Sequence, residues 1–185
     1  MLGTYLYFLY KYILKQYRYL KYTPPKGIVE LKRFTGKFTY TKDPRKKGFV
    51  VINPSWLRDN IVKVDLPIIV PLQERIWTIH CHKKVANNLR ALFYEYLIRH
   101  YDERYPIYQL GCFVPRHKMS DTSKSLSLHA YGVALDINWK HNKLGTRGNI
   151  PKEIILRFKQ YGWNWGGLWT KPKDPMHFQY IQPMK

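Results

Sequence analysis

The chain has 185 residues, of which 45% are hydrophobic and 16% aromatic, enough apolar surface for one folded domain and too much for a disordered polymer. Its two cysteines, Cys81 and Cys112, exclude a disulfide-rich scaffold and leave open whether they pair. Lys and Arg outnumber Asp and Glu by 32 to 12, and the net charge of +20 attracts polyanions such as nucleic acid, anionic lipid and the anionic polymers of bacterial envelopes.

Residues 1–22 are rich in tyrosine and contain no acidic residue. Lys11, Lys15 and Arg18 recur at i, i+4 and i+7, so they share one stripe of a helix whose other surface is aromatic and aliphatic. The pattern predicts an amphipathic helix, which would pack on the domain or a partner protein or lie on an anionic membrane surface. Because the positive charges follow the apolar start and no small-residue cleavage site comes next, a cleavable signal peptide is disfavoured.

Residues 23–47 are basic and mixed, and they are predicted to be a linker and lead-in to a domain that spans residues 48–185. Apolar runs and alternating patterns predict four strands in the first part of this domain, at residues 49–52, 60–66, 76–80 and 107–114. Pro67 is expected to end the second of these strands.

Two helices are predicted in the same domain. Residues 83–100 carry apolar side chains at spacings of three and four, so they form the main core helix. Residues 151–161 form a second helix, with Pro151 at its first position and Gly162 after its end. Short strands around these helices indicate an α+β fold: a single compact domain with a small antiparallel sheet flanked by helices.

A strand that carries an acidic residue follows Gly132. Its apolar positions, Val133, Leu135 and Ile137, alternate with Ala134, Asp136 and Asn138. An unpaired carboxylate is costly to bury, so Asp136 is expected to pair with a cation or to bind a metal.

His129 precedes Asp136 by seven residues. The two side chains would be ~23 Å apart in a straight strand and ~10 Å apart in a helix, and neither arrangement lets them share a ligand. A bend over residues 130–132 would fold the histidine back over the strand, and Gly132 is the residue type that permits such a bend.

A second polar cluster lies near the end of the chain. His177 opens another alternating run and is predicted to start a terminal strand, while Asp174 lies in the loop that leads into it. Between the two clusters, residues 162–169 contain three tryptophans and three glycines, a composition that favours a rigid aromatic cleft wall with tight turns.

In their order and spacing these residues resemble the zinc D-alanyl-D-alanine carboxypeptidases and the L-alanyl-D-glutamate endopeptidases of phage endolysins, which share a hedgehog-like fold. The family pattern is Ser-x-His-x-x-Gly-x-Ala-x-Asp, then Trp-Gly-Gly, then Asp/Glu-x-x-His. The matching residues are Ser127, His129, Gly132, Ala134, Asp136, Trp165, Gly166, Gly167, Asp174 and His177. The resemblance covers about residues 114–180, is looser over the helix at 83–101, and does not include residues 1–22.

The resemblance implies a role for each polar residue. His129, Asp136 and His177 would bind one Zn²⁺ and leave its fourth position to water. Asp174 would be the general base, and Arg116 would steady the substrate carbonyl and the developing oxyanion.

Ser127 would orient the site or contact the substrate, and Trp165 and Trp169 would contact the substrate. The implied function is zinc-dependent hydrolysis of a peptide bond in the stem or cross-bridge peptides of peptidoglycan, by a carboxypeptidase or endopeptidase. A phage lysin or a virion-associated hydrolase would act in this way, in the virion or at the host cell envelope, and residues 1–22 would then dock on a phage tail, another assembly or an anionic membrane. The alternative is a non-catalytic wall-binding or structural virion protein that keeps the fold. Nucleic acid is disfavoured as a partner because the chain has no recognisable nucleic-acid motif.

Overall fold

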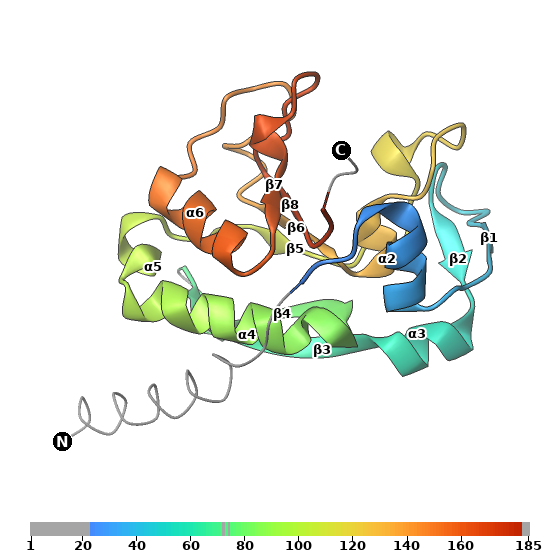
Figure 1. The fold of residues 1–185 in the computed structure, drawn as a ribbon, viewed down its shortest axis with the longest axis horizontal. Coiled ribbons are helices and arrows are strands. Elements are labelled where there is room, and N and C mark those ends of the chain that lie inside the picture. Colours follow the sequence, from blue (N-terminus) through green and yellow to red (C-terminus); the bar gives the residue numbers. More distant parts are fainter. Residues whose placement is uncertain (1–22, 72, 74, 183–185) are drawn as a thin grey trace.

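The computed structural model describes residues 23–71, 73 and 75–182, and the helix predicted at residues 1–22 lies outside them. The described chain is a compact α+β fold with small antiparallel sheets and several helices, as predicted (Figure 1). Two sheets are hairpins, β1-β2 and β3-β4, and the third has four strands in the order β5-β6-β8-β7. None of the helices in this described part has both the length and the apolar character needed to span a bilayer.

The predicted lead-in, residues 23–47, contains regular structure. Helix α2 (Gly27–Thr35) places Leu31 in the core with no exposed surface, and it is followed by strand β1 (Tyr40–Lys42). The start of α2 is tied to the far end of the described chain, because the amide of Gly27 donates to the carbonyl of Gln182. This segment is therefore part of the packed body of the protein.

Strand β2 (Val50–Ile52) pairs with β1, and α3 (Pro54–Asn60) leads into the long hairpin of β3 (Ile61–Val70) and β4 (Arg75–His82). The expectation that Pro67 ends a strand is wrong, because β3 continues three residues beyond it. The register of the hairpin shifts between Leu66 and Ile69, so the proline, which has no amide hydrogen to donate, falls where the ladder is interrupted.

The main core helix, α4 (Lys83–Ile98), is found where the apolar spacing predicts it and ends two residues earlier. It packs on β3 through an apolar stripe that includes Val85, Leu89, Leu92 and Phe93, none of which has exposed surface. The one-turn helix α5 (Tyr101–Arg104) follows. The hairpin and α4 thus form a two-layer base beneath the four-stranded sheet (Figure 1).

The four-stranded sheet holds the residues of the predicted site. Its strands are β5 (Leu110–Gly111), β6 (Ala134–Ile137), β7 (Asn164–Trp165) and β8 (His177–Gln179). Helix α6 (Lys152–Gln160), predicted with one more residue at each end, packs on it through Phe158, whose ring centroid lies 4.3 Å from that of Phe178. Three short 3₁₀ helices complete the described fold: η1 (Lys118–Ser120), η2 (Leu128–Tyr131) and η3 (Gly166–Leu168).

The strand predicted at residues 107–114 is much shorter than expected, since β5 contains two residues. The flanking backbone amides donate to other acceptors: those of Tyr108 and Gln109 donate to the side-chain oxygen of Asn138, and that of Phe113 donates to the carbonyl of His80. The segment is extended, but these bonds prevent it from continuing the sheet ladder.

Candidate metal centre

Strand pairing brings Asp136 and His177 together. They are direct partners in the antiparallel ladder of β6 and β8, so their side chains leave the same face of the sheet. The Oδ1 atom of Asp136 lies 3.0 Å from the Nδ1 atom of His177. A separation of 41 residues in sequence is thereby reduced to hydrogen-bond distance.

A bend brings His129 to the same point. His129 lies in η2, and the helix ends at Gly132, whose φ of 66° is the left-handed conformation that favours glycine. The predicted bend at residues 130–132 is therefore present. It places the Nε2 atom of His129 3.2 Å from Oδ2 of Asp136 and 3.2 Å from Nδ1 of His177.

The orientation of the His129 ring is fixed by the backbone behind it. Its Nδ1 atom is 2.6 Å from the carbonyl oxygen of Cys112 and donates its hydrogen to it, which leaves Nε2 as the lone-pair nitrogen that faces Asp136. Ser127 caps the start of η2, with its hydroxyl oxygen accepting from the amide of His129 at 3.3 Å. Ser127 thus orients the site through the backbone.

The three side chains fit a metal ion. One ligand atom from each of His129, Asp136 and His177 lies within 4.8 Å of the other two, the one such group in the part of the chain that the structure describes. Two imidazoles and a carboxylate are a donor set that zinc accepts, and a carbonyl bonded to the outer nitrogen of a histidine ligand is the usual support of such a site.

The centre is electrostatically coupled. Burial by itself disfavours ionisation of Asp136, but the hydrogen bonds and charges of His129 and His177 outweigh it and hold the pKa of this carboxyl well below its usual range. Asp136 is therefore an anion in a nearly closed site, since 19% of its side chain is exposed.

Asp174 lies in the loop that leads into β8, as predicted. Its amide donates to the carbonyl of Gly166, and its own carbonyl accepts from the amide of His177. The Oδ1 atom is buried and accepts no hydrogen bond from a described residue. Burial raises the pKa of the Asp174 carboxyl, and although His177 opposes the rise most strongly, the negative charge of Asp136 adds to it.

The Trp-Gly-Gly segment supports this loop. The indole N–H of Trp165 donates to the carbonyl of Pro175 at 2.8 Å. A side chain at Gly166 would come within 2.7 Å of the carbonyl oxygen of Asp174, and one at Gly167 would overlap the ring of Trp165. Both positions therefore require glycine, because the carbonyl of Asp174 and the ring of Trp165 lie too close for a side chain. Trp165, predicted to contact the substrate, holds the loop that carries Asp174.

The other predicted substrate contacts lie around the centre. The half-buried Arg116 forms an isolated antiparallel bridge with Phe49, and its positive charge lowers the pKa of Asp174, the smallest of the effects on that carboxyl. The ring of Trp169 is 38% exposed, and its centroid lies 5.4 Å from that of His177.

Sequence reasoning missed Trp139, which is 41% exposed. Its ring lies 3.8 Å from the position that a side chain on Gly111 would take, and Gly111 is the ladder partner of Asp136 on β5. Paired positions share a face, so Trp139 lies near the face that carries Asp136, while Trp169 lies against His177. The signal available was the position of Trp139 directly after the strand that carries Asp136.

Comparison with known proteins agrees with this geometry. The family model of D-alanyl-D-alanine carboxypeptidase matches residues 120–180, which include His129, Asp136, Asp174 and His177. Neither the curated proteins nor the solved structures contain a match to the chain. The family match supports a metallopeptidase that acts on peptidoglycan. The segment of residues 120–180, which carries the candidate metal centre, is thus similar to the D-alanyl-D-alanine carboxypeptidase family.

Proposed function

We propose that this protein is a zinc-dependent peptidase that hydrolyses a peptide bond in the stem or cross-bridge peptides of bacterial peptidoglycan. The observation that carries the proposal is the convergence of His129, Asp136 and His177 within 4.8 Å. The half-buried carboxyl of Asp174, whose pKa is affected by the charges of the same residues, and the family match support it.

His129 through Nε2, His177 through Nδ1 and Asp136 through its carboxylate would hold the ion. When bound, Zn²⁺ supplies Lewis acidity, which lowers the pKa of a water molecule and polarises a carbonyl group. The donation from His129 to the carbonyl of Cys112 fixes which ring nitrogen is available.

Asp174 is the proposed proton carrier. Its Oδ1 has no hydrogen-bond partner among the described residues, so it can accept a proton from the attacking water. Because burial raises the pKa of this carboxyl, the acid that results is a weaker donor than an exposed one and can retain the proton until the amine leaves. Arg116, whose charge reaches Asp174, would bind the scissile carbonyl and the negative charge that develops on it.

The exposed rings of Trp139 and Trp169 are the proposed walls of the substrate cleft. Aromatic side chains bind a peptide with large apolar area and lose little conformational freedom when they do so. Trp139 beside the partner of Asp136 and Trp169 beside His177 suit a peptide that binds next to these two residues.

The proposed place of action is the bacterial envelope, with the chain acting as a phage lysin or a virion-associated hydrolase. The net charge of +20 supports this setting, because envelope polymers are anionic.

The test is mass spectrometry of purified peptidoglycan after digestion, combined with the zinc content of the same protein. The wild type should release peptides and carry one zinc. Asp174→Asn should keep the zinc and lose about 100-fold or more in turnover, while the same carboxyl-to-amide change at the exposed Asp59 should alter neither. Undiminished turnover in Asp174→Asn would remove Asp174 from the mechanism. Intact peptidoglycan with zinc bound would favour the wall-binding alternative.

A further inference from the structure

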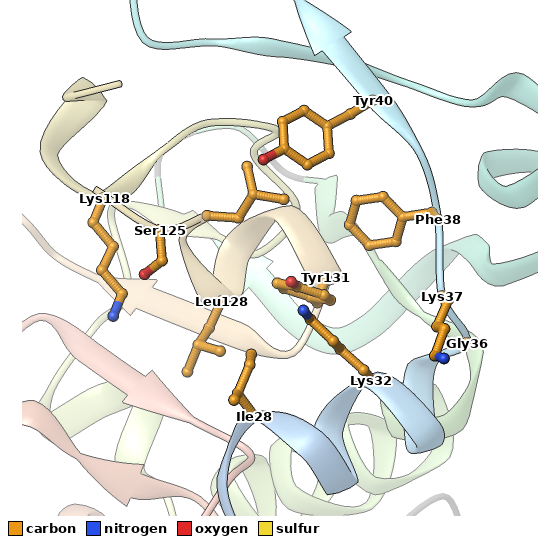
Figure 2. A pocket seen from close by; sticks show the side chains of 11 residues that line it. Ile28, Lys32, Gly36, Lys37, Phe38, Tyr40, Lys118, Ser125, Leu128 and Tyr131 are labelled. Carbon is orange, nitrogen blue, oxygen red and sulfur yellow. The ribbon is translucent and has the colours of Figure 1, made fainter. Parts of the chain in front are cut away.

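A cavity of about 740 Å³ lies outside the candidate metal centre (Figure 2). It is bounded by α2, by the segment from Gly36 to the first residue of β1, by the start of η1, and by η2 with the residues just before it. The side chains that give it its character are Lys32, Lys37, Phe38, Tyr40, Lys118 and Tyr131, and we call it the basic cavity. Its lining residues come both from residues 120–180, which match the family model, and from the part of the chain that precedes residue 120.

The short helix η2 separates the basic cavity from the metal centre. Leu128 and Tyr131 line the cavity, whereas His129, between them in sequence, faces Asp136. None of the three metal-binding candidates lines the cavity. The basic cavity is therefore a second site, and a ligand in it would leave the metal centre accessible.

Charge in the basic cavity has one sign. Lysines from three separate segments line it, and the lining contains no acidic residue. Within residues 23–71, 73 and 75–182, none of these three ammonium groups forms an ion pair. Figure 2 shows Lys32 directed toward the ring of Tyr131 and Lys118 along the opposite wall. The arrangement presents several point charges to one ligand rather than a single fork for a carboxylate.

Aromatic rings form the other wall. The ring centroid of Phe38 lies 5.1 Å from that of Tyr131, 4.4 Å from that of Trp56 and 6.4 Å from that of Tyr40. Tyr40 is 44% exposed, so part of this wall is open to a ligand. Rings of this kind offer apolar area for the body of a sugar or polyol.

The walls are held in place before any ligand binds. The carbonyl of Thr35, at the end of α2, accepts from the indole of Trp56 at 3.1 Å and is bonded to the ring of His82 at 3.2 Å. The carbonyl of Phe34 accepts from the ammonium group of Lys84. Because α2 is anchored from three other elements, α3, β4 and α4, the cavity is preformed, as ligand sites usually are.

We propose that the basic cavity binds the sugar-phosphate or polyol-phosphate units of an anionic envelope polymer. Ammonium groups from α2, from the segment after it and from η1 suit successive phosphates along a chain, and the aromatic rings of the lining suit the carbon skeleton that joins the phosphates. The inference rests on the proposed function only for the choice of an envelope polymer. Such a site would hold the protein on the wall while the metal centre acts on peptides.

The test is calorimetric titration of the full chain with a short glycerol-phosphate oligomer. The reversal Lys32→Glu with Lys118→Glu should weaken binding about ten-fold or more, and Tyr40→Ala should weaken it without a change in charge. A matched reversal, Lys152→Glu with Lys159→Glu on α6, lies at the other end of the molecule and should bind like the wild type (Figure 1). Monomeric glycerol phosphate should bind more weakly than the oligomer.

Three results would overturn the proposal. The first is equal weakening of binding in the two double reversals, which would mean that bulk charge alone attracts the oligomer. The second is equal affinity for the monomer and the oligomer, and the third is equally tight binding of single-stranded DNA with the same number of phosphates. The readout is binding, and hydrolysis of a soluble stem peptide should be the same in the reversal of Lys32 and Lys118 as in the wild type. If neither the wild type nor any variant hydrolysed the stem peptide while the wild type still bound the glycerol-phosphate oligomer, the proposed function would be contradicted and this inference would stand.

Discussion

Backbone contacts position the side chains of the candidate metal centre. The ring of His129 is oriented by the carbonyl of Cys112, and the loop that carries Asp174 is held by the indole of Trp165 bonded to the carbonyl of Pro175. A reacting group must be held within about 0.5 Å of its productive place, so these supporting contacts matter to the rate although they touch no substrate.

Replacement of Trp165 by Phe tests this support. The change keeps the aromatic ring and removes the N–H that donates to Pro175. We expect turnover to fall several-fold with zinc content unchanged, because the Asp174 loop is freed, and we expect stability to fall by about 1 kcal/mol for the lost hydrogen bond. Steady-state kinetics, metal analysis and denaturant unfolding measure the three quantities.

The matched control is Trp77→Phe. Trp77 lies on β4, outside the four-stranded sheet, and donates its indole N–H to the carbonyl of Ile107 at 3.1 Å. This variant should lose similar stability and retain full turnover. If both variants slow turnover equally, the effect of Trp165 is general destabilisation and not positioning.

For single residues, the sequence predicted the metal-binding side chains but not the groups that orient them. His129, Asp136 and His177 could be selected because few residue types bind metals and their spacing matched a family pattern. The carbonyl of Cys112 could not, because it reaches the ring of His129 only through the packing of segments that are 17 residues apart in sequence.

Among the elements, α2 and α4 are joined through one buried histidine. His82 caps α4 by accepting from the amide of Lys84 through Nδ1, and its Nε2–H donates to the carbonyl of Thr35 at the end of α2. The bond from the amide of Lys84 requires the neutral ring, since a protonated one has no acceptor for it, whereas the bond to Thr35 can form in either state. Burial, the largest effect, lowers the pKa of His82 from 6.5 to about 4.

The pH dependence of stability follows from this shift. Above pH 6.5 the ring is neutral in both states, and the contribution of His82 is fully present. As the pH falls from 6.5 to about 4, the unfolded state takes up the proton first, so stability falls by about 3 kcal/mol at most. His82→Asn keeps a capping acceptor and cannot titrate in this range, so the variant should have a flatter profile over the same interval.

Urea unfolding at several pH values measures this difference. The control is His80→Asn, because His80 is exposed on the same strand, and its profile should follow that of the wild type. Parallel profiles for wild type and His82→Asn would show that His82 does not carry the effect.

Elements that are determined by their own residues could be predicted from the sequence, and elements that depend on packing against distant segments could not. The bend at Gly132 follows from one residue type and the need to return His129 to the strand, and α4 follows from its apolar spacing. Helix α2 makes no side-chain cap at its start and is stabilised by burial of Leu31 against the core, which its own residues do not reveal. Likewise, β3 passes Pro67 only because the ladder is interrupted there.

At the scale of the whole molecule, the excess of positive charge coexists with a metal centre that needs acidic residues. After Asp136, the only acidic residues of the chain are Glu153 and Asp174. Asp136 and Asp174 are thus acidic groups in a positive surrounding, and both are partly shielded from solvent. A positive field of this kind acts on the approach of a large anionic substrate far more than on the bond-breaking step.

Salt should therefore separate the two steps. Hydrolysis of intact sacculi, which are large and anionic, should slow as NaCl rises from about 0.05 M to 0.5 M, because the Debye length shrinks from roughly 14 Å to 4 Å and long-range attraction is screened. Hydrolysis of a short stem peptide should change little over the same range, since the contacts at the metal centre are buried. The measurement is the initial rate on both substrates in one salt series. Equal loss on both substrates would place the salt effect at the metal centre and would contradict a role of the +20 charge in capturing the wall.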